Sequence, residues 1–270
     1  MIYVHDKGRL ANNILQYGHF YAWGREHGRQ TVSMRFAYKY QYFHICHTRH
    51  HNFLTYVFAK FAAKWHLLPL LCFTEEDLAP DCRKQKEQEM LKHGSLVVTG
   101  WEARWYDLFL KYRADIAALF AFDAAIERHA AGLLHDGLRL GVHIRRGDYA
   151  GFYGGRFLYS DEVYADVARR FVRLHPGERV TVYICGNDPA MDRDLFRLSL
   201  ADCEVVFPDG NPGEDLCLLS HCHYLIGAPS TFTLVAAMYR DLPLYWIEDP
   251  AAPVTEGSFR KFDYLFQHIY

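Results

Sequence analysis

The chain has 270 residues, of which 50% are hydrophobic and 23% charged, enough to bury the core of one large domain or two ordinary ones. Its net charge is −2 at pH 7 and it has no run of five or more like charges, which argues against a nucleic-acid groove or a polybasic membrane patch. The seven cysteines are odd in number and lack a Cys-x-x-Cys pair, which indicates free thiols in a reducing compartment. The N-terminus carries no signal-peptide pattern, and the most apolar run, residues 67–73, is interrupted by Pro69 and is far shorter than the roughly 20 residues of a membrane helix. We therefore expect a globular, cytoplasmic protein that binds no nucleic acid.

Short apolar strands alternate with helical patterns, which is typical of a parallel α/β fold. The first half opens with a strand at Ile2–Val4, a helix at Asn13–His27 and a strand at Thr31–Phe36. Apolar and small residues recur at helical spacing from Ile14 to Ala22, and Gly28 is a suitable helix stop. Between about residues 37 and 135 the pattern is mostly helical, with one strand predicted at Leu96–Thr99.

The second half resembles a compact βα domain. Its predicted strands are Leu138–Ile144, Val180–Cys185, Cys203–Phe207, Tyr224–Ile226 and Leu244–Ile247, and its predicted helices are Asp161–Leu174 and Thr231–Tyr239. Ser160 is a suitable N-cap for the first of these helices, and Asp161 and Glu162 suit its first turn. We place a domain boundary near Gly137, which gives domains at 1–136 and 137–250 and a tail at 251–270 with a last helix at Ser258–Ile269.

The most informative segment follows the strand Leu138–Ile144, where the chain reads Val142-His143-Ile144-Arg145-Arg146-Gly147-Asp148-Tyr149. Open α/β sheets bind ligands beyond the carboxyl ends of their strands. Arginine forks match phosphate oxygens, so paired arginines at this place predict a nucleotide diphosphate site. The alternative is an Arg–Asp ion pair that only stabilises a turn.

Three segments, in order, resemble one family. His143-Ile144-Arg145-Arg146-Gly147-Asp148-Tyr149 resembles the His-x-Arg-Arg-x-Asp motif of α1,2-, α1,6- and protein O-fucosyltransferases, and in its full form is most similar to the α1,2 enzymes. Gly8-Arg9-Leu10-Ala11-Asn12-Asn13 resembles that family's Gly-Arg-Leu-Gly-Asn-Gln, and the segments at 215–222 and 226–233 resemble its C-terminal motifs. The chain is therefore identified as a distant, bacterial member of the α1,2-fucosyltransferase family.

The resemblance implies two Rossmann-like domains facing across a cleft, the GT-B type, with an acceptor-side N-terminal domain and a C-terminal domain that binds the nucleotide sugar. It also implies that the last helix could cross back to the first domain. The expected partners are the donor GDP-β-L-fucose and a glycan acceptor, with no cofactor and no metal. Animal members carry a Golgi anchor that this chain lacks, so we expect a cytoplasmic enzyme, with possible peripheral contact where lipid-linked glycans are built.

For the donor, the resemblance assigns the β-phosphate to Arg145, with Arg146 assisting or merely pairing with Asp148. His143 would lie beside the nucleoside, or be a satisfied core histidine. Ser230, Thr231 and Phe232 begin a helix, whose N-terminus suits a phosphate, although a Ser-Thr pair there is usually only a cap. Asp215 would accept from guanine, or be an ordinary acid of a first helical turn.

The first motif supplies Arg9 and Asn12, which the resemblance places on the donor as well. This chain departs from the family pattern at Ala11, Asn13 and Pro229, which puts donor and acceptor choice in question.

The acceptor hydroxyl needs a base, for which the candidates are Glu102, Asp6 and Asp148. The segment Gly100-Trp101-Glu102-Ala103-Arg104-Trp105-Tyr106 resembles a family segment that contacts the acceptor. We therefore expect Glu102 to contact the acceptor and, as the second choice, to act as the base. The aromatic side chains of Trp101 and Tyr106 could stack on a sugar ring, or they could belong to the core. The segment 149–157, rich in glycine, suggests a loop that closes over the donor.

Two patterns could suggest a metal. Asp192-Arg193-Asp194 mimics an Asp-x-Asp motif, but its place at the start of a helix favours a structural role. The cluster His44, Cys46, His47, His50 and His51 has ligand spacing but no second ligand set.

The sequence thus predicts a metal-independent, inverting transferase of L-fucose from GDP-β-L-fucose to a galactose hydroxyl, with an α1,2 linkage. Transfer with another linkage or acceptor, and nucleotide-sugar binding without turnover, are the alternatives.

Overall fold

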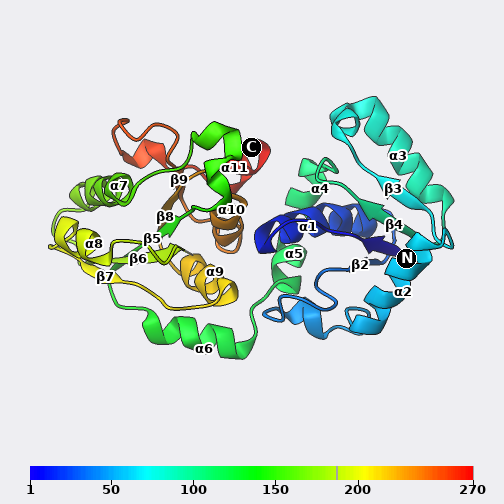
Figure 1. The fold of residues 1–270 in the computed structure, drawn as a ribbon, viewed down its shortest axis with the longest axis horizontal. Helices are drawn as coiled ribbons and strands as arrows, with labels where there is room; N and C mark the ends of the chain where they lie inside the picture. The colour runs from blue at the N-terminus through cyan, green and yellow to red at the C-terminus, as the bar shows by residue number, and fades with distance from the viewer. Residues whose placement is uncertain (187, 270) are drawn as a thin grey trace. The chain divides into compact units, whose positions relative to one another are not determined.

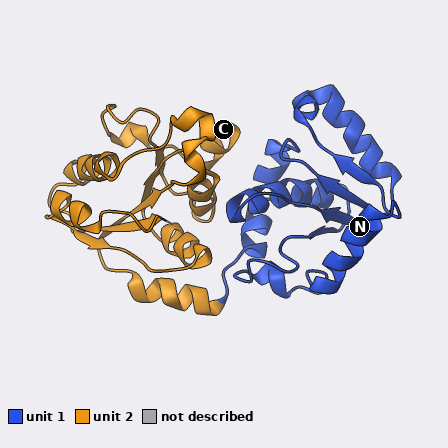
Figure 2. Ribbon diagram, in the orientation of Figure 1, with its two compact units in different colours: residues 1–123 blue, residues 124–270 orange. Residues whose placement is uncertain are grey.

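The fold was taken from a computed structural model, in which residues 1–186 and 188–269 are described. The chain divides into two compact units, Met1–Asp123 and Ala124–Tyr270 (Figure 2). Each unit has its own sheet of parallel strands with helices around it (Figure 1). The predicted class, α/β with parallel sheets, is confirmed.

Unit 1 is built on a sheet with the strand order β2-β1-β4-β3. Its strands are β1 (Ile2–Val4), β2 (Thr31–Ser33), β3 (Leu70–Cys72) and β4 (Leu96–Thr99). Its helices are α1 (Leu10–Glu26), α2 (Phe53–Lys64), α3 (Pro80–Lys92), α4 (Tyr106–Lys111) and α5 (Arg113–Leu119), with 3-10 turns η1 (His44–His47) and η2 (Glu75–Leu78). The sequence did not predict β3, because this short edge strand follows Pro69 and leaves Leu70 exposed, so no period-2 pattern marks it.

Helix α1 begins at Leu10, three residues before the predicted start. Gly8 has φ +93, a conformation that favours glycine, and Arg9 is the extended N-cap residue. The Gln16 amide then holds the preceding loop, because its Nε2 donates to the Lys7 carbonyl at 2.6 Å and its Oε1 accepts from the Lys7 N–H at 3.2 Å. Asn12 and Asn13 consequently belong to the first helical turn rather than to a loop.

Unit 2 is built on a sheet with the strand order β7-β6-β5-β8-β9. Its strands are β5 (Leu138–Ile144), β6 (Val180–Gly186), β7 (Glu204–Val206), β8 (Tyr224–Gly227) and β9 (Leu244–Trp246). Its helices are α6 (Ala124–Leu133), α7 (Asp161–Leu174), α8 (Arg193–Ser199), α9 (Pro212–Ser220), α10 (Thr231–Met238) and α11 (Phe262–Gln267), with 3-10 turns η3 (Asp148–Ala150), η4 (Phe152–Gly155) and η5 (Glu256–Ser258). The strands and the helices α7 and α10 lie within a few residues of their predicted positions.

The central strand β5 separates two layers of side chains. Leu140, Val142 and Ile144 join one hydrophobic cluster with residues of α7 and α8. Gly141 faces the other side, where an added Cβ would meet Leu219 of α9 at 2.6 Å. Alternation along the strand therefore directs His143, two residues after Gly141, to the layer that holds α9 and α10.

The division between the units falls after Asp123, earlier than the predicted boundary near Gly137. Helix α6 packs against α9 of unit 2, and Glu127 of α6 pairs with His221 Nε2 at 2.9 Å. Gly137, with φ +101, is the turn that leads from α6 into β5. At the other end of unit 2, α11 contacts α10 of the same unit.

Candidate functional site

The carboxyl edge of the unit 2 sheet gathers most of the predicted donor residues. In the sheet, His143 of β5 lies opposite Cys185 of β6 and Gly227 of β8. Strands β5 and β8 therefore end side by side, and the residues that follow them share one edge. These residues are Arg145, Arg146 and Asp148 after β5, and Ser230, Thr231 and Phe232 after β8.

Arg146 is held by two carboxylates from distant parts of unit 2. Its Nη2 lies 2.6 Å from Asp161 Oδ1 and its Nη1 lies 2.6 Å from Asp188 Oδ2. Asp161 also accepts from the Asp192 N–H at 2.9 Å, so the three side chains tie the end of β5 to the starts of α7 and α8. Arg146 thus pairs with Asp161 and Asp188, two acids that the sequence did not assign to it.

Arg145 instead makes the pair with Asp148, at 2.8 Å. The Arg145 side chain is 16% exposed and that of Asp148 is 50% exposed. The Tyr149 ring lies 5.3 Å from the Arg145 guanidinium carbon. The guanidinium is thus oriented by one partly solvated carboxylate and an aromatic ring, an arrangement that leaves donors for an anion.

His143 is buried and neutral beside Phe232. The two rings are stacked with centroids 4.5 Å apart and an interplanar angle of 19°. Burial and the charge of Arg145 lower the pKa of His143 to about 3, so the imidazole is uncharged at physiological pH. Its Nδ1 atom has no hydrogen-bond partner among the described residues. An unpartnered buried nitrogen at a strand end suits contact with a ligand.

Asp215 lies in the first turn of α9 and is half-buried, with its Oδ1 atom shielded from solvent. Burial, followed by the charges of Glu214 and Asp209, raises its pKa to about 7, although a hydrogen bond with the Cys185 thiol acts in the opposite direction. Beyond that thiol, its Oδ1 atom has no partner among residues 1–186 and 188–269. Cys185, which contacts Asp215, is the register neighbour of His143 on the adjacent strand, so Asp215 and His143 approach the same part of the edge.

The start of α10 is a well-formed cap. Ser230 Oγ accepts from the Thr233 N–H at 3.3 Å, and Thr233 Oγ1 in turn accepts from Trp246 Nε1 at 3.1 Å. These hydroxyls are therefore engaged in the fold, and the helix N-terminus is left to attract an anion through its dipole and first-turn N–H groups. The contribution of Trp246 was not predicted from the sequence.

The predicted loop 149–157 is anchored at both ends. Tyr149 is buried, and its hydroxyl donates to the Pro229 carbonyl at 2.5 Å, which links the loop to the turn before α10. Phe157 is fully buried, whereas Tyr153 at the tip is 59% exposed. Any closing motion is therefore confined to the tip.

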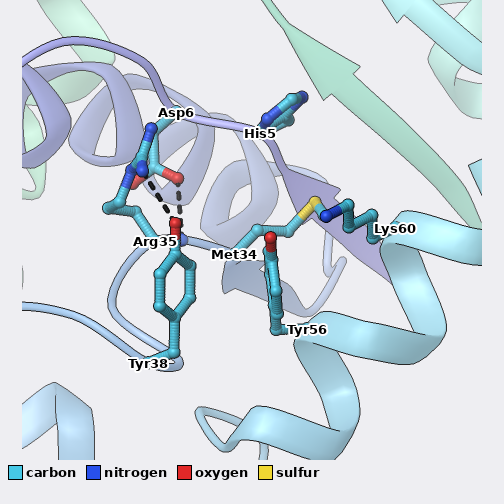
Figure 3. Close-up of a pocket in the computed structure, with 7 residues that line it drawn as sticks. All are labelled: His5, Asp6, Met34, Arg35, Tyr38, Tyr56 and Lys60. Atoms are coloured by element: carbon cyan, nitrogen blue, oxygen red, sulfur yellow. Dashed lines mark hydrogen bonds between the residues drawn. The ribbon is translucent and has the colours of Figure 1, made fainter.

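In unit 1, a cavity of about 230 Å³ opens where β1 and β2 end (Figure 3). Its lining includes Asp6 after β1, Arg35 and Tyr38 after β2, and Tyr56 and Lys60 from α2. Burial raises the pKa of Asp6 to about 7 against the opposing effect of a hydrogen bond from Ser33. Its carboxylate accepts from Ser33 Oγ at 2.6 Å and from the Arg35 N–H at 3.1 Å.

The predicted acceptor residues follow β4, the neighbour of β1 in the same sheet. The Arg104 guanidinium lies 3.9 Å from the centroid of the Trp101 ring and so covers one face of it, and the His19 ring meets Tyr106 edge-on at 5.6 Å. Arg104 is 5% exposed, and its Nη1 has no partner among the described residues. Sequence reasoning missed Arg104, although it stands inside the acceptor segment that was singled out. Burial lowers the pKa of Arg104, and Tyr106 and then Glu102 act in the opposite direction.

The remaining donor predictions, Arg9 and Asn12, lie at the start of α1 in unit 1. Arg9 is the N-cap residue, and Asn12 packs so closely on Gly8 that an added Cβ there would lie 2.8 Å from its Nδ2. Arg9 thus stands at the N-cap of α1 and Asn12 in its first turn.

Groups that could hold a metal are few among the described residues. The three side chains Glu127, Cys217 and His221 come together, but His221 uses Nε2 toward Glu127 and Nδ1 toward Arg240 at 2.9 Å, which leaves it no ligand atom. In the histidine cluster, His47 pairs with Asp123 at 2.9 Å, and His51 Nε2 accepts from the Ser33 N–H at 3.0 Å. Asp192 caps α8 by accepting from the Leu195 N–H, as its position predicted.

The chain is similar in sequence to curated proteins that are named as transferases. No family model matches the chain. Galactoside alpha-(1,2)-fucosyltransferase 1 of Rattus norvegicus is 27% identical over 169 residues, covering 56% of this chain and 44% of that protein. Galactoside alpha-(1,2)-fucosyltransferase 2 of Mus musculus is 29% identical over 154 residues, covering 52% and 43%. The chain thus spans less than half the length of these relatives, and the predicted distant resemblance to α1,2-fucosyltransferases is confirmed.

Solved structures share the fold over nearly the whole chain. A mutant of Arabidopsis thaliana FUT1 in complex with GDP has a TM-score of 0.63 at 12% identity, covering 96% of this chain and 73% of that one. POFUT1 in complex with GDP has a TM-score of 0.59 at 12% identity, with coverage of 91% and 97%. NodZ alpha-1,6-fucosyltransferase co-crystallized with GDP has a TM-score of 0.55 at 14% identity, with coverage of 90% and 94%. The predicted GT-B fold class is confirmed by this likeness.

Among the described residues, no helix is both long enough and apolar enough to cross a bilayer.

Proposed function

We propose that this chain transfers L-fucose from GDP-β-L-fucose to a galactose hydroxyl of a glycan, with inversion and formation of an α1,2 linkage. The observation that carries the proposal is the difference between the two arginines at the end of β5. Arg146 pairs with Asp161 and Asp188, whereas Arg145 pairs with the partly solvated Asp148. The names of the relatives support it, since those of the curated proteins specify galactoside alpha-(1,2)-fucosyltransferases and those of the solved structures include GDP and GDP-fucose complexes.

In this proposal the donor lies along the carboxyl edge of unit 2. The guanine base donates its two edge N–H groups to Asp215, and the unpartnered Nδ1 of His143 meets the nucleoside. The diphosphate lies between Arg145 and the N-terminus of α10. Asp148 then orients Arg145, because the two side chains are already 2.8 Å apart.

Departure of GDP places negative charge on the β-phosphate, and we propose that protein cations and amides, rather than a metal, stabilise it. A preorganised guanidinium at the oxygen where charge develops stabilises the transition state more than the ground state. Arg9 and Asn12 of the first motif are the proposed further contacts to the donor.

The acceptor hydroxyl must lose its proton, and the proposed acceptor side is unit 1. Glu102 and Asp6 are the two candidate bases there, and the pKa of Asp6, about 7, is matched to that task. Trp101 and Tyr106 are the proposed sugar contacts, with the free face of Trp101 opposite Arg104.

The first experiment is calorimetric titration of GDP, GDP-fucose, UDP and ADP into the protein with EDTA present. Selective binding of the two guanine ligands is expected and would support both the donor and the absence of a metal requirement. Equal affinity for all four ligands would refute the donor assignment. Linkage analysis of the product formed on galactosides then distinguishes α1,2 transfer from other linkages.

A second candidate is nucleotide-sugar binding without turnover, favoured by the departures Ala11, Asn13 and Pro229 from the family pattern. It requires GDP-fucose to bind and remain intact with every acceptor offered.

We also propose a cytoplasmic setting and a bacterial surface glycan precursor as acceptor. The seven cysteines, all free, accord with a reducing compartment.

A further inference from the structure

Helix α2 buries its small residues and exposes its large ones. Ala59 and Ala62 are buried, and Ala59 packs with Tyr3, Val32 and Val97 of the sheet. Several bulky apolar side chains of the same helix remain largely exposed, although Tyr56 packs against this cluster and the ring of Phe58 meets that of Tyr3 edge-on. An ordinary surface helix has the opposite distribution, with its large apolar residues toward the core.

The exposed residues form a continuous stripe. Leu54, Phe58, Phe61 and Trp65 follow the spacing i, i+4, i+7 and i+11, which places them on one face of a helix. Their exposures are 79%, 56%, 39% and 63%. Phe53, Leu67 and Leu70 extend the set with exposures of 61%, 71% and 54%. We call these seven residues the α2 patch.

The α2 patch offers a sizeable apolar area. At roughly 100 Å² exposed for each large side chain, the four residues of the stripe alone offer on the order of 400 Å², within the about 300–600 Å² of the largest patch on a typical monomer. A surface of this size usually marks an interaction site.

The stretch of sequence that carries the α2 patch is basic. None of the 32 acidic residues of the chain lies within residues 27–74, a stretch that holds the arginines and lysines Arg29, Arg35, Lys39, Arg49, Lys60 and Lys64. Lys60 and Lys64 stand on α2 itself, on the flank beside the stripe, and both are exposed. The surrounding chain adds six histidines and no acid. The basic residues of this stretch are scattered rather than consecutive, so its positive charge shows in the sequence only as the absence of acidic residues.

We propose that the α2 patch docks on the surface of an anionic membrane. Exposed Trp, Phe and Leu beside lysines on one helix are the side chains that enter the interface between lipid headgroups and acyl chains, and lysines attract anionic lipids. A second copy of this chain is a poorer occupant, because a two-fold contact would set the same basic flank against itself.

Docking there would also bring the unit 1 cavity to the lipid surface. Tyr56 and Lys60 line this cavity from α2, the helix that carries the stripe (Figure 3). The inference goes beyond the proposed transfer reaction, and vesicle binding is measured without donor or acceptor, so either proposal can fail without the other.

The test is flotation of the protein with phosphatidylcholine vesicles that do or do not contain phosphatidylglycerol. We expect at least about tenfold tighter binding to the anionic vesicles, lost at high salt. Trp65 is the most exposed of the five tryptophans, since Trp101 is half-buried and Trp23, Trp105 and Trp246 are buried. Binding should therefore blue-shift the emission and protect Trp65 from a soluble quencher.

Two variants alter the α2 patch, and a third serves as a control. Leu54→Ser/Phe58→Ser should reduce vesicle binding about tenfold or more through lost apolar insertion, and Lys64→Glu should remove the preference for anionic lipid. Leu198→Ser is the matched control, since Leu198 of unit 2 is 80% exposed, as Leu54 is at 79%, and its replacement should change nothing. Thermal melting of each variant verifies that it folds.

Three outcomes would overturn the proposal. They are no binding of the folded wild type to either vesicle, an equal loss with Leu198→Ser, and self-association of the wild type that the double variant abolishes. The last would make the α2 patch an interface between two copies.

Discussion

Two carboxylates, one in each unit, have similar pKa values but different surroundings: Asp6 is buried and Asp215 is half-buried. Asp6 follows β1 at the edge of the unit 1 sheet, and Asp215 lies in the first turn of α9 near the edge of the unit 2 sheet. Burial raises the pKa of each to about 7. Asp6 has both oxygens occupied, by Ser33 Oγ and the Arg35 N–H, whereas Asp215 Oδ1 has no partner among the described residues. Burial raises the pKa of both groups, and the supply of hydrogen-bond donors decides which carboxylate oxygen is left for a ligand.

The largest expected effect on unit 2 comes from replacing Arg145, the arginine that is proposed to contact the leaving phosphate. Arg145→Ala should lower the transfer rate about 10²–10³-fold, because it deletes a donor aimed at the leaving phosphate. Steady-state assays with GDP-fucose measure the effect, and Arg145→Lys should recover only part of it because a lysine lacks the fork. A near-wild-type rate in Arg145→Ala would refute the phosphate assignment.

The contrast between the two carboxylates predicts different consequences for GDP. Asp215→Asn should weaken GDP about 10–100-fold, the cost of a lost hydrogen bond to a charged group of roughly 1.5–3 kcal/mol. Binding of UDP should change much less, because only the guanine contact is removed. Asp6→Asn is the matched control in unit 1 and should leave GDP affinity unchanged. Calorimetry of the two variants decides between these expectations.

The raised pKa of Asp215 makes guanine recognition dependent on pH. Only the ionised carboxylate accepts two N–H donors, so affinity should be flat above pH 7 and fall up to about tenfold for each pH unit below it. Guanosine, which has no phosphate to titrate, is the cleaner ligand for this measurement. The same decline in Asp215→Asn would show that another group is responsible.

The smallest expected effect is on stability. The pKa of Asp215 is raised from 3.8 to about 7 in the folded protein, so the stability it contributes is present below pH 3.8 and lost as the pH rises toward 7. Asp215→Asn should therefore stabilise the protein above pH 7 by roughly 1–3 kcal/mol, a few degrees in Tm. Asp6→Asn should gain little, because it gives up an acceptor of a satisfied pair of hydrogen bonds. Thermal melts at pH 5 and pH 8 test both, and a gain for Asp6→Asn equal to that for Asp215→Asn would remove the distinction.

The neighbouring arginines show where prediction from sequence reached its limit. The motif placed both at a strand end, and the structure puts them there. Their difference arises from Asp161 and Asp188, which are 15 and 42 residues away from Arg146 along the chain. No local pattern reports such a pairing, because it depends on how α7 and the segment after β6 pack against β5.

The sequence by itself determined the α/β class, the strands and helices of the second half, and the edge at which the motif residues gather. Apolar runs, cap residues and glycine stops are local signals, and parallel strands place their carboxyl ends at one edge whatever the details of packing. Only the tertiary structure decided that Arg146 pairs with two acids and that Asp215 Oδ1 has no hydrogen-bond partner among the described residues. It also decided where the units divide and which face of α2 is covered. Each of these depends on side chains brought together from distant parts of the chain. For α2, the alanines fit against the sheet and the larger residues are left exposed, a choice that hydrophobicity alone would have reversed.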